Sequence, residues 1–124
     1  MKRILLDTNF LIDLAKFKID AEELSVILTE PYRLFMFSSA VTELKKIAEG
    51  RGSSSKFAKI ALEMIRLEGI GIVKVKEKDT DKAVLNLANE DTIIATNDRE
   101  LRKKLKNLGI KTIYLRSKKH LAMS

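Results

Sequence analysis

Short apolar runs alternate along the chain with longer segments whose apolar residues recur at the 3.6-residue period of an α-helix. The short runs are rich in β-branched and aromatic residues, which is typical of strands buried on both faces of a sheet. Five strands are expected, at residues 3–6, 34–37, 70–75, 92–95 and 111–115. The periodic segments predict helices at residues 9–17, 21–29, 40–49, 57–67, 81–89 and 99–108.

This alternation limits the fold. Strands separated by helices form parallel sheets with right-handed crossovers and helices on both faces. We therefore predict the α/β class, with a five-stranded parallel sheet. A chain of 124 residues has room for one domain, residues 1–124. Within it we expect a flexible loop at residues 50–55 and a basic tail at residues 117–124.

Composition excludes several kinds of protein. The sequence has no cysteine and one histidine, His120, which rules out disulfides, thiolate metal sites and a cysteine nucleophile. No apolar run approaches the roughly 20 residues of a membrane span. Asp7 interrupts the first apolar run too early for a signal peptide. We therefore expect a cytoplasmic protein that does not enter a membrane.

Positive charge is concentrated near the C-terminus. The chain has 24 Lys and Arg against 17 Asp and Glu, a net charge of +7. Nine basic residues and one acid lie between positions 99 and 119, so this segment carries +8 and the remainder −1. Such a segment could bind a polyanion such as nucleic acid. The alternative is a solvated helix face in a protein rich in Lys and Glu.

Acidic residues follow four of the predicted strands. Asp7 ends the first strand, and Glu43 lies in the helix that follows the second. Asp81 and Asp98 stand where helices begin after the third and fourth strands. In folds of this kind ligands bind at the carboxyl ends of the strands. We therefore expect these carboxylates to share one pocket.

Structural interpretations of the same acids remain open. Asp81 and Asp98 would offset the positive end of a helix dipole. Asn97 and Glu100 would form a capping box without Asp98. Glu43 lies at the margin of the apolar face of its helix, where a carboxylate needs a partner.

Gathered carboxylates repel one another. At an effective dielectric constant of 20, two like charges 4 Å apart repel by about 4 kcal/mol, so either some are protonated or a cation lies among them. A site with only oxygen ligands favours Mg²⁺ or Mn²⁺ over zinc. An acidic metal pocket beside a basic helix suits a nuclease, because the cation serves the chemistry and the lysines hold the strand.

Four sequence blocks resemble the PIN domain family: ILLDTN at residues 4–9, VTEL at 41–44, DKAV at 81–84 and ATNDRELR at 95–102. Their order, together with GIKTIYLR at residues 109–116, extends the resemblance over the whole chain. The sequence is most similar to small archaeal members related to enzymes that process ribosomal RNA, and more distantly to bacterial VapC-type toxins. The resemblance implies a three-layer α/β/α sandwich and a metal-dependent endoribonuclease that cleaves single-stranded RNA.

The resemblance also implies roles for individual residues. The acidic metal site falls on four carboxylates: Asp7, Glu43, Asp81 and Asp98. Thr96 matches the polar partner beside the last acid, and Asn9 matches a polar residue after the first. Close relatives often carry a second acid where this chain has Lys82. That lysine would either weaken metal binding or point outward and contact RNA.

The first hypothesis is therefore an endoribonuclease that depends on Mg²⁺ or Mn²⁺. Asp7 and Asp98 would be the principal ligands, while Glu43 and Asp81 would complete the site and position the attacking water. The expected contacts to the RNA backbone come from the last helix: Arg99, Arg102, Lys103 and Lys106. The alternative hypothesis is a non-catalytic RNA- or protein-binding module, which Lys82 motivates.

Other partners are left open. The apolar residues between 10 and 28 could form a self-association surface, and the family resemblance is compatible with a homodimer. An antitoxin and a ribosome-assembly protein are both candidate partners. A phosphoacceptor receiver domain would share the layout, but the lysine expected directly after its last strand is missing here, where Ser117 stands.

Overall fold

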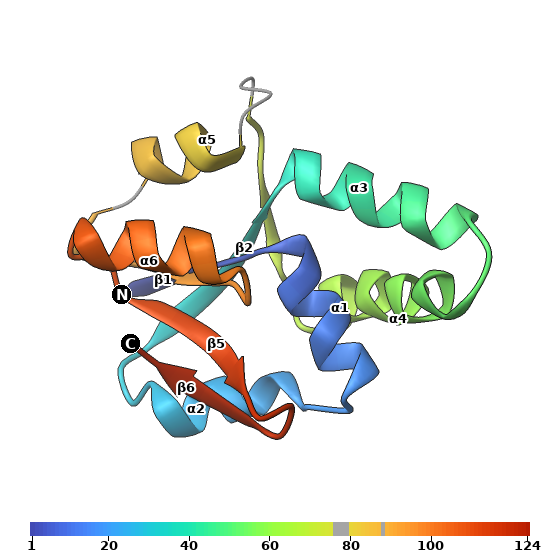
Figure 1. The fold of residues 1–124 in the computed structure, drawn as a ribbon, viewed down its shortest axis with the longest axis horizontal. Helices are drawn as coiled ribbons and strands as arrows, with labels where there is room; N and C mark the ends of the chain where they lie inside the picture. The colour runs from blue at the N-terminus through green and yellow to red at the C-terminus, as the bar shows by residue number, and fades with distance from the viewer. Residues whose placement is uncertain (76–79, 88) are drawn as a thin grey trace.

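The computed structural model describes residues 1–75, 80–87 and 89–124 of the chain (Figure 1). Within these residues the strands form a six-stranded sheet in the order β3-β2-β1-β4-β5-β6. The strands are β1 (Lys2–Leu6), β2 (Tyr32–Phe37), β3 (Gly71–Val73), β4 (Thr92–Ala95), β5 (Thr112–Arg116) and β6 (His120–Met123). The neighbours from β3 to β5 pair in parallel, so their carboxyl ends lie at one edge of the sheet. The predicted α/β class is confirmed.

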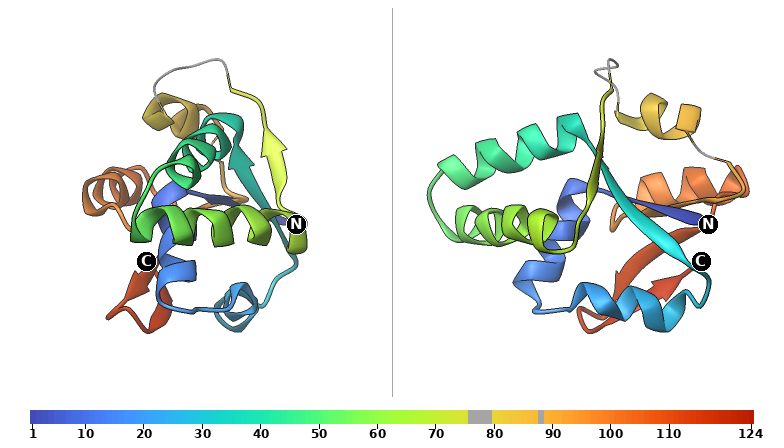
Figure 2. Two further views of the ribbon diagram at one scale, coloured as in Figure 1. Left: turned by 90° about the vertical axis from the view of Figure 1, so that its right-hand side faces the viewer. Right: turned by 180° about the vertical axis from the view of Figure 1, so that it is seen from behind.

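Helices lie on both sides of the sheet (Figure 1, Figure 2). They are α1 (Thr8–Lys16), the 3₁₀ helix η1 (Ala21–Glu23), α2 (Leu24–Ile27), α3 (Ser38–Glu49), α4 (Ser53–Leu67), α5 (Thr80–Leu87) and α6 (Arg99–Asn107). α1, α3 and α4 pack together on one side, and α5 and α6 lie on the other. Among the helices that the structure describes, none has the length and apolar character needed to cross a bilayer.

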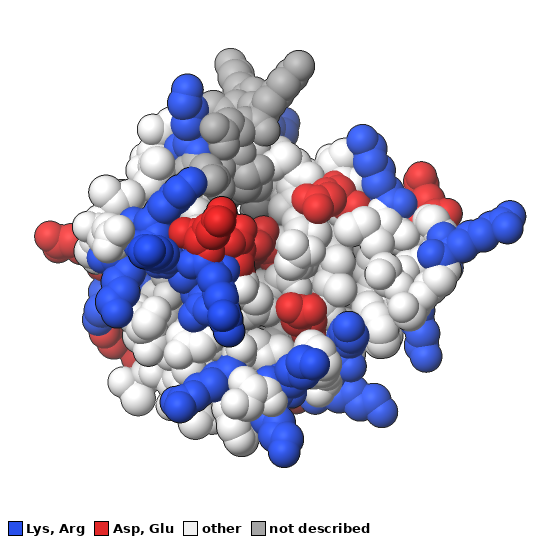
Figure 3. Space-filling model, viewed as in Figure 1, with Lys and Arg blue, Asp and Glu red and all other residues white. Residues whose placement is uncertain are grey.

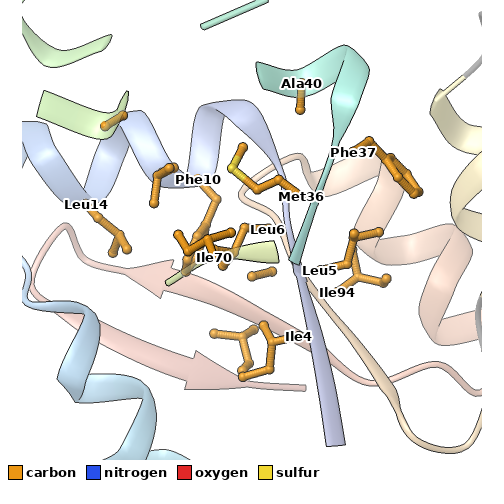
Figure 4. Close-up of a cluster of buried hydrophobic side chains, with 14 of the residues drawn as sticks. Ile4, Leu5, Leu6, Phe10, Leu14, Met36, Phe37, Ala40, Ile70 and Ile94 are labelled. Carbon is orange, nitrogen blue, oxygen red and sulfur yellow. The ribbon is translucent and has the colours of Figure 1, made fainter. Parts of the chain in front are cut away.

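Apolar side chains fill the space between the sheet and both helical layers (Figure 4). In β1 three consecutive side chains, Ile4, Leu5 and Leu6, are buried, because successive residues of a strand point to opposite faces and both faces are covered here. Phe10 and Leu14 of α1 reach the core on one side of the sheet. The buried sheet thus provides a rigid base for the residues that follow each strand.

The sixth strand corrects the sequence analysis. Residues 117–124, predicted as a basic tail, contain β6, which pairs antiparallel with β5 in the register Leu115↔Leu121. Leu121 is buried, so the segment has a core-facing residue of its own. The basic residues that precede Leu121 make the short alternation of buried and exposed residues in β6 difficult to recognise in the sequence.

Two further segments differ from the prediction. Residues 53–55, predicted as part of a flexible loop, form the first turn of α4. Buried Ser55 donates a hydrogen bond of 2.8 Å to the carbonyl of Ala48, which satisfies an end carbonyl of α3. Residues 21–29 form η1 and the single turn α2 rather than one helix, and the chain is extended at Leu28.

Candidate active site

A pocket of about 200 Å³ opens at the carboxyl ends of the central strands, where the sequence predicted a site. Three of the four predicted carboxylates line it: Asp7, Glu43 and Asp98. Asp7 directly follows β1, Glu43 lies in the second turn of α3, and Asp98 immediately precedes α6. The parallel arrangement of β1, β2 and β4 brings these three segments to the same edge.

Asp7, which lines this pocket, is held in place by two hydrogen bonds. Its Oδ1 accepts a hydrogen bond from the backbone N–H of Thr8 over 2.8 Å, and its Oδ2 accepts one from the hydroxyl of Thr96 over 3.0 Å. Burial raises the pKa of Asp7, and the negative charges of Glu43 and Asp98 raise it further, while the hydrogen bonds from Thr96 and Thr8 act in the opposite direction. The net effect is a raised pKa, so the charged form of Asp7 is destabilised in the folded protein.

Two threonines connect the three acidic residues, through the carboxylates of Asp7 and Glu43 and the backbone of Asp98. Thr8 donates its hydroxyl hydrogen bond to Oε2 of Glu43 over 3.3 Å. Thr96 accepts a hydrogen bond from the backbone N–H of Asp98 over 3.1 Å while it donates to Asp7. Both threonines are almost completely buried, with 2% and 0% of their surface exposed. The site is thus one hydrogen-bonded unit built from β1, α1, α3 and the β4–α6 connection.

Thr8 is a site residue that was not predicted from the sequence. The available signal was its position directly after Asp7, at the start of a helix. A threonine hydroxyl at this position lies close to the groups that surround the aspartate carboxylate. Asn9, the residue predicted there instead, is exposed and also lines the pocket.

Asp98 is the N-cap of α6, so the predicted capping box of Asn97 and Glu100 is wrong. Its Oδ1 accepts hydrogen bonds from the backbone N–H groups of Glu100 and Leu101, over 2.9 and 3.2 Å. Asn97 has another function. Its Nδ2 donates to Oδ2 of Asp13 over 2.8 Å, and its Oδ1 accepts from the N–H of Leu115 over 2.8 Å.

The hydrogen bond to Asn97 gives Asp13 a place in the same region of the fold. Asp13 is half-buried and joins α1 to the β4–α6 connection through Asn97. The residues that lie on either side of Asn97, Thr96 and Asp98, both belong to the pocket network.

Asp81 lies in the first turn of α5, but its side chain falls outside the described part of the structure. The position of its carboxylate relative to the pocket therefore stays a prediction. The neighbouring Lys82 is exposed.

The donor set determines which cation the pocket suits. All of its acidic groups are carboxylates, and hard divalent cations such as Mg²⁺ and Mn²⁺ prefer oxygen ligands. The ion pairs among the described residues, Lys2–Asp91 and Arg66–Glu63, involve none of the three pocket carboxylates. Within residues 1–75, 80–87 and 89–124, no three acidic, His or Cys side chains stand close enough to hold a metal ion on their own. The fit to a hard divalent cation therefore rests on the type of donor, the three pocket carboxylates, and not on a ligand cluster already assembled among the described residues.

Basic side chains of α6 lie next to the acidic pocket. Figure 3 shows Lys and Arg gathered over α6 and Asp and Glu close to the N-terminal ends of α6 and α3. Three of the four predicted RNA contacts are exposed: Arg99, Lys103 and Lys106. Arg102 is half-buried, and its guanidinium carbon lies 3.9 Å from the ring centre of Tyr114, a stacked cation–π arrangement.

Comparison with known families decides what kind of protein carries this pocket, because residues 4–118 match the PIN like domain. The chain belongs to the PIN-like domain family. The match extends from β1 into the β5–β6 turn, and it includes every carboxylate named above. The family that the sequence motifs indicated is therefore confirmed.

Individual similar proteins and structures agree with this assignment. Over 125 residues the chain is 34% identical to a protein named Ribonuclease VapC4 from Methanocaldococcus jannaschii, covering 97% of this chain and 95% of the relative. It is similar in structure to the PIN domain endonuclease Utp24, with a TM-score of 0.78 and 21% identity over 98% of this chain and 90% of the other. A domain of a functionally unknown protein from M. jannaschii gives a TM-score of 0.65 and 18% identity over 94% and 93%. These structural likenesses show the PIN fold, and the sequence relative makes the chain a homologue of a named ribonuclease.

Proposed function

We propose that this PIN-like protein is a divalent-metal-dependent endoribonuclease that cleaves phosphodiester bonds of single-stranded RNA. The observation that carries the proposal is the state of Asp7. It is a largely buried carboxylate with a raised pKa, it lies between the negative charges of Glu43 and Asp98, and no ion pair within the described residues offsets its charge. A bound dication would remove this cost. The similarity to a protein named as a ribonuclease supports the reaction class.

The carboxylates have distinct proposed roles. Asp7 and Asp98 would be the principal ligands of Mg²⁺ or Mn²⁺, and Glu43 and Asp81 would complete the site and orient the attacking water. A dication bound there supplies positive charge that neutralises the charge developing on the phosphodiester. Thr8 and Thr96 hold the carboxylates in position through the hydrogen bonds described above.

The proposed substrate follows from the charge and shape of the surface. Arg99, Arg102, Lys103 and Lys106 extend along α6 beside the pocket, where they would hold successive phosphates. A flexible single strand can bend into a concave pocket, which a stiff duplex cannot do. Contacts to phosphates fix the position of the strand but carry little sequence information, so we expect weak sequence preference from α6.

The direct test is cleavage of unstructured RNA in the presence of Mn²⁺ by the wild type and by Asp7→Asn. We expect cleavage by the wild type, its loss on addition of a chelator, and a severe loss in Asp7→Asn. Asp91→Asn is a matched control, because Asp91 is an exposed aspartate at the opposite edge of the sheet, before β4. Equal cleavage by the wild type and Asp7→Asn would refute the mechanism.

A non-catalytic RNA- or protein-binding module is the second candidate. It is favoured by the exposed Lys82 beside Asp81 and by the absence of a ready three-ligand cluster among the described residues. It predicts salt-sensitive RNA binding without cleavage, and little effect of Mn²⁺ on thermal stability. Calorimetric titration with Mn²⁺ separates the two functions, because tight binding that requires Asp7 supports the enzyme.

Partner proteins stay predictions. The family resemblance is compatible with a homodimer, but many of the apolar side chains proposed to form its surface are in the core: Phe10, Leu11, Leu14, Leu24 and Leu28 are buried. Ile12, Phe17 and Ile27 are half-buried, and Val26 is exposed over 78% of its surface. Light scattering on the purified protein tests self-association. Co-purification with a neighbouring gene product or with ribosomal precursors distinguishes an antitoxin from a ribosome-assembly partner.

A further inference from the structure

A second group of basic side chains lies away from α6. It consists of five exposed cations at the end of α1 and in the β5–β6 turn, which together we name the hairpin surface: Lys16, Lys18, Arg116, Lys118 and Lys119. In the view of Figure 3, Lys and Arg gather over this turn and the end of α1, below the acidic centre of the face, while the α6 cations lie to its left. The acidic centre thus has basic surfaces on two sides.

The two halves of the hairpin surface meet at Phe17. The ammonium group of Lys16 lies 5.3 Å from the centre of the Phe17 ring, and that of Lys118 lies 5.7 Å from the same centre. Residues from opposite ends of the chain are therefore brought together around one half-buried aromatic ring.

Among the described residues, no ion pair involves any of these five cations. The described ion pairs, Lys2–Asp91 and Arg66–Glu63, lie elsewhere. The acids that flank the end of α1 are engaged in other hydrogen bonds, Asp13 with the side chain of Asn97 and Asp20 with the N–H of Glu22. Cations at a helix C-terminus are favourable for the helix dipole, which accounts for lysines on α1. The helix dipole does not account for the cations that the β5–β6 turn brings to the same place.

The turn itself holds its lysine in an unfavourable backbone conformation. Its central residues, Ser117 and Lys118, have φ angles of 54° and 57°, and the N–H of Lys119 bonds to the carbonyl of Arg116 over 3.1 Å. Such two-residue turns favour Asn and Gly, because other L-residues pay about 1–2 kcal/mol in the left-handed region. The chain thus places a lysine where Gly or Asn would be more stable.

We propose that the hairpin surface binds backbone phosphates of the RNA strand on one side of the pocket, while α6 binds them on the other. A polyanion would offset the repulsion among the five cations, and flexible exposed lysines suit phosphates rather than base edges. This inference rests on the proposed function, and it assigns the RNA path across the face shown in Figure 3. A substrate long enough to reach both surfaces binds more tightly than one that covers the pocket alone.

The test compares a long and a short unstructured RNA, of about 16 and about 4 nucleotides, which span the range of site sizes of single-strand binding domains. Dissociation constants are measured by fluorescence anisotropy at several salt concentrations, with a chelator present so that no RNA is cleaved. The variant combines Lys118→Asn with Lys119→Gln, because Asn tolerates the left-handed conformation and both changes remove charge. We expect the slope of log K against log salt on the long RNA to become shallower by about 1.4, at 0.7 for each lost contact.

The control combines Lys56→Gln with Lys59→Gln, which removes two exposed charges from α4. We expect its slope to equal that of the wild type. A slope on the long RNA that is unchanged in the hairpin variant overturns the inference, and so does a wild type that binds long and short RNA equally tightly. Failure of the proposed function has a different signature, because it is an absence of cleavage with Mn²⁺ and leaves these binding slopes measurable.

Discussion

Thr96 donates its hydroxyl hydrogen bond to Oδ2 of Asp7 over 3.0 Å, although 89 residues separate the two in the chain. The same hydroxyl oxygen accepts the backbone N–H of Asp98. Thr96 therefore stabilises the charged form of Asp7 and fixes the backbone at Asp98. This makes it the connection between the two proposed principal ligands.

Replacement of Thr96 by Val is expected to separate this electrostatic effect from packing. The valine side chain has nearly the same shape but donates no hydrogen bond, so it leaves Asp7 with less support for its charge and its pKa rises further. We expect the acid limb of the pH–rate profile for RNA cleavage to shift to higher pH. The lost hydrogen bonds should lower the free energy of unfolding by about 1–3 kcal/mol.

Thr112→Val is the matched control. Thr112 is also completely buried, and its hydroxyl bonds to that of Ser124 at the far end of β5 from the pocket. It should lose stability without a shift in the pH profile. Identical pH profiles for Thr96→Val and the wild type would show that Thr96 has only a structural role.

Asp7→Asn is expected to stabilise the metal-free protein at neutral pH. The pKa of Asp7 is higher in the folded state than in the unfolded chain, where it is about 3.9. The folded state therefore holds its proton more tightly, and stability falls as pH rises from the unfolded value through the folded one. Above both pKa values the wild type is destabilised by the full free energy of holding an ionised Asp7 in the fold. The neutral amide of Asn removes this destabilisation.

Chemical denaturation at several pH values in the presence of a chelator measures this effect. The advantage of Asp7→Asn should be present at pH 7 and should disappear below about pH 4, where the aspartate is protonated in both states. Asp91→Asn should show no such gain, because Asp91 is an exposed residue and its ion pair with Lys2 contributes little. A loss of stability in Asp7→Asn at pH 7 would show that ionised Asp7 is favourable in the fold.

Addition of Mn²⁺ should reverse the order of stability. A ligand that binds only the folded state adds about 2.7 kcal/mol to the free energy of unfolding when its concentration is about 100 times Kd. We expect a rise in the melting temperature of the wild type and a much smaller one for Asp7→Asn and Asp98→Asn. An equal rise in all three proteins would place the bound cation outside the pocket.

The sequence predicted the features that depend on the periodicity of side chains. Buried strands such as β1 and β4 have a clear apolar signature, and parallel pairing then requires the residues that follow them to share an edge. The same logic predicts that Asp7 and Asp98 share one pocket, and both line it. The turn that starts β6 was missed because its left-handed residues, Ser117 and Lys118, are not the usual Gly or Asn.

Hydrogen bonds between distant side chains have no such signature. Asn97 looks like a helix cap in the sequence, because Glu100 stands three residues later, yet its amide bonds to Asp13 and to the backbone of Leu115. Either Asn97 or Asp98 could cap α6, and the choice depends on the tertiary contacts of the other residue. Here the distant partner of Asn97 leaves the cap to Asp98.

The bond between Asn97 and Asp13 yields the last prediction. Asn97→Asp keeps an oxygen for the N–H of Leu115 but places a second carboxylate against Asp13 at a site where the two side chains lie 2.8 Å apart. At neutral pH we expect a loss of about 2–4 kcal/mol of stability, since like charges at this distance repel strongly in a half-buried setting. Stability should recover as pH falls and one of the pair becomes protonated, because protonation removes one charge and restores a donor.

A second substitution distinguishes repulsion from a general loss of packing. Asp13→Asn, added to Asn97→Asp, restores one amide and one carboxylate with their positions exchanged, so it should return most of the lost stability. Asp13→Asn alone should be mildly destabilising, because an amide oxygen still accepts the bond from Asn97. If the double variant were as unstable as Asn97→Asp, the two losses would be independent, and the bond would not be what ties α1 to the β4–α6 connection. Denaturant unfolding of the four proteins measures the coupling directly.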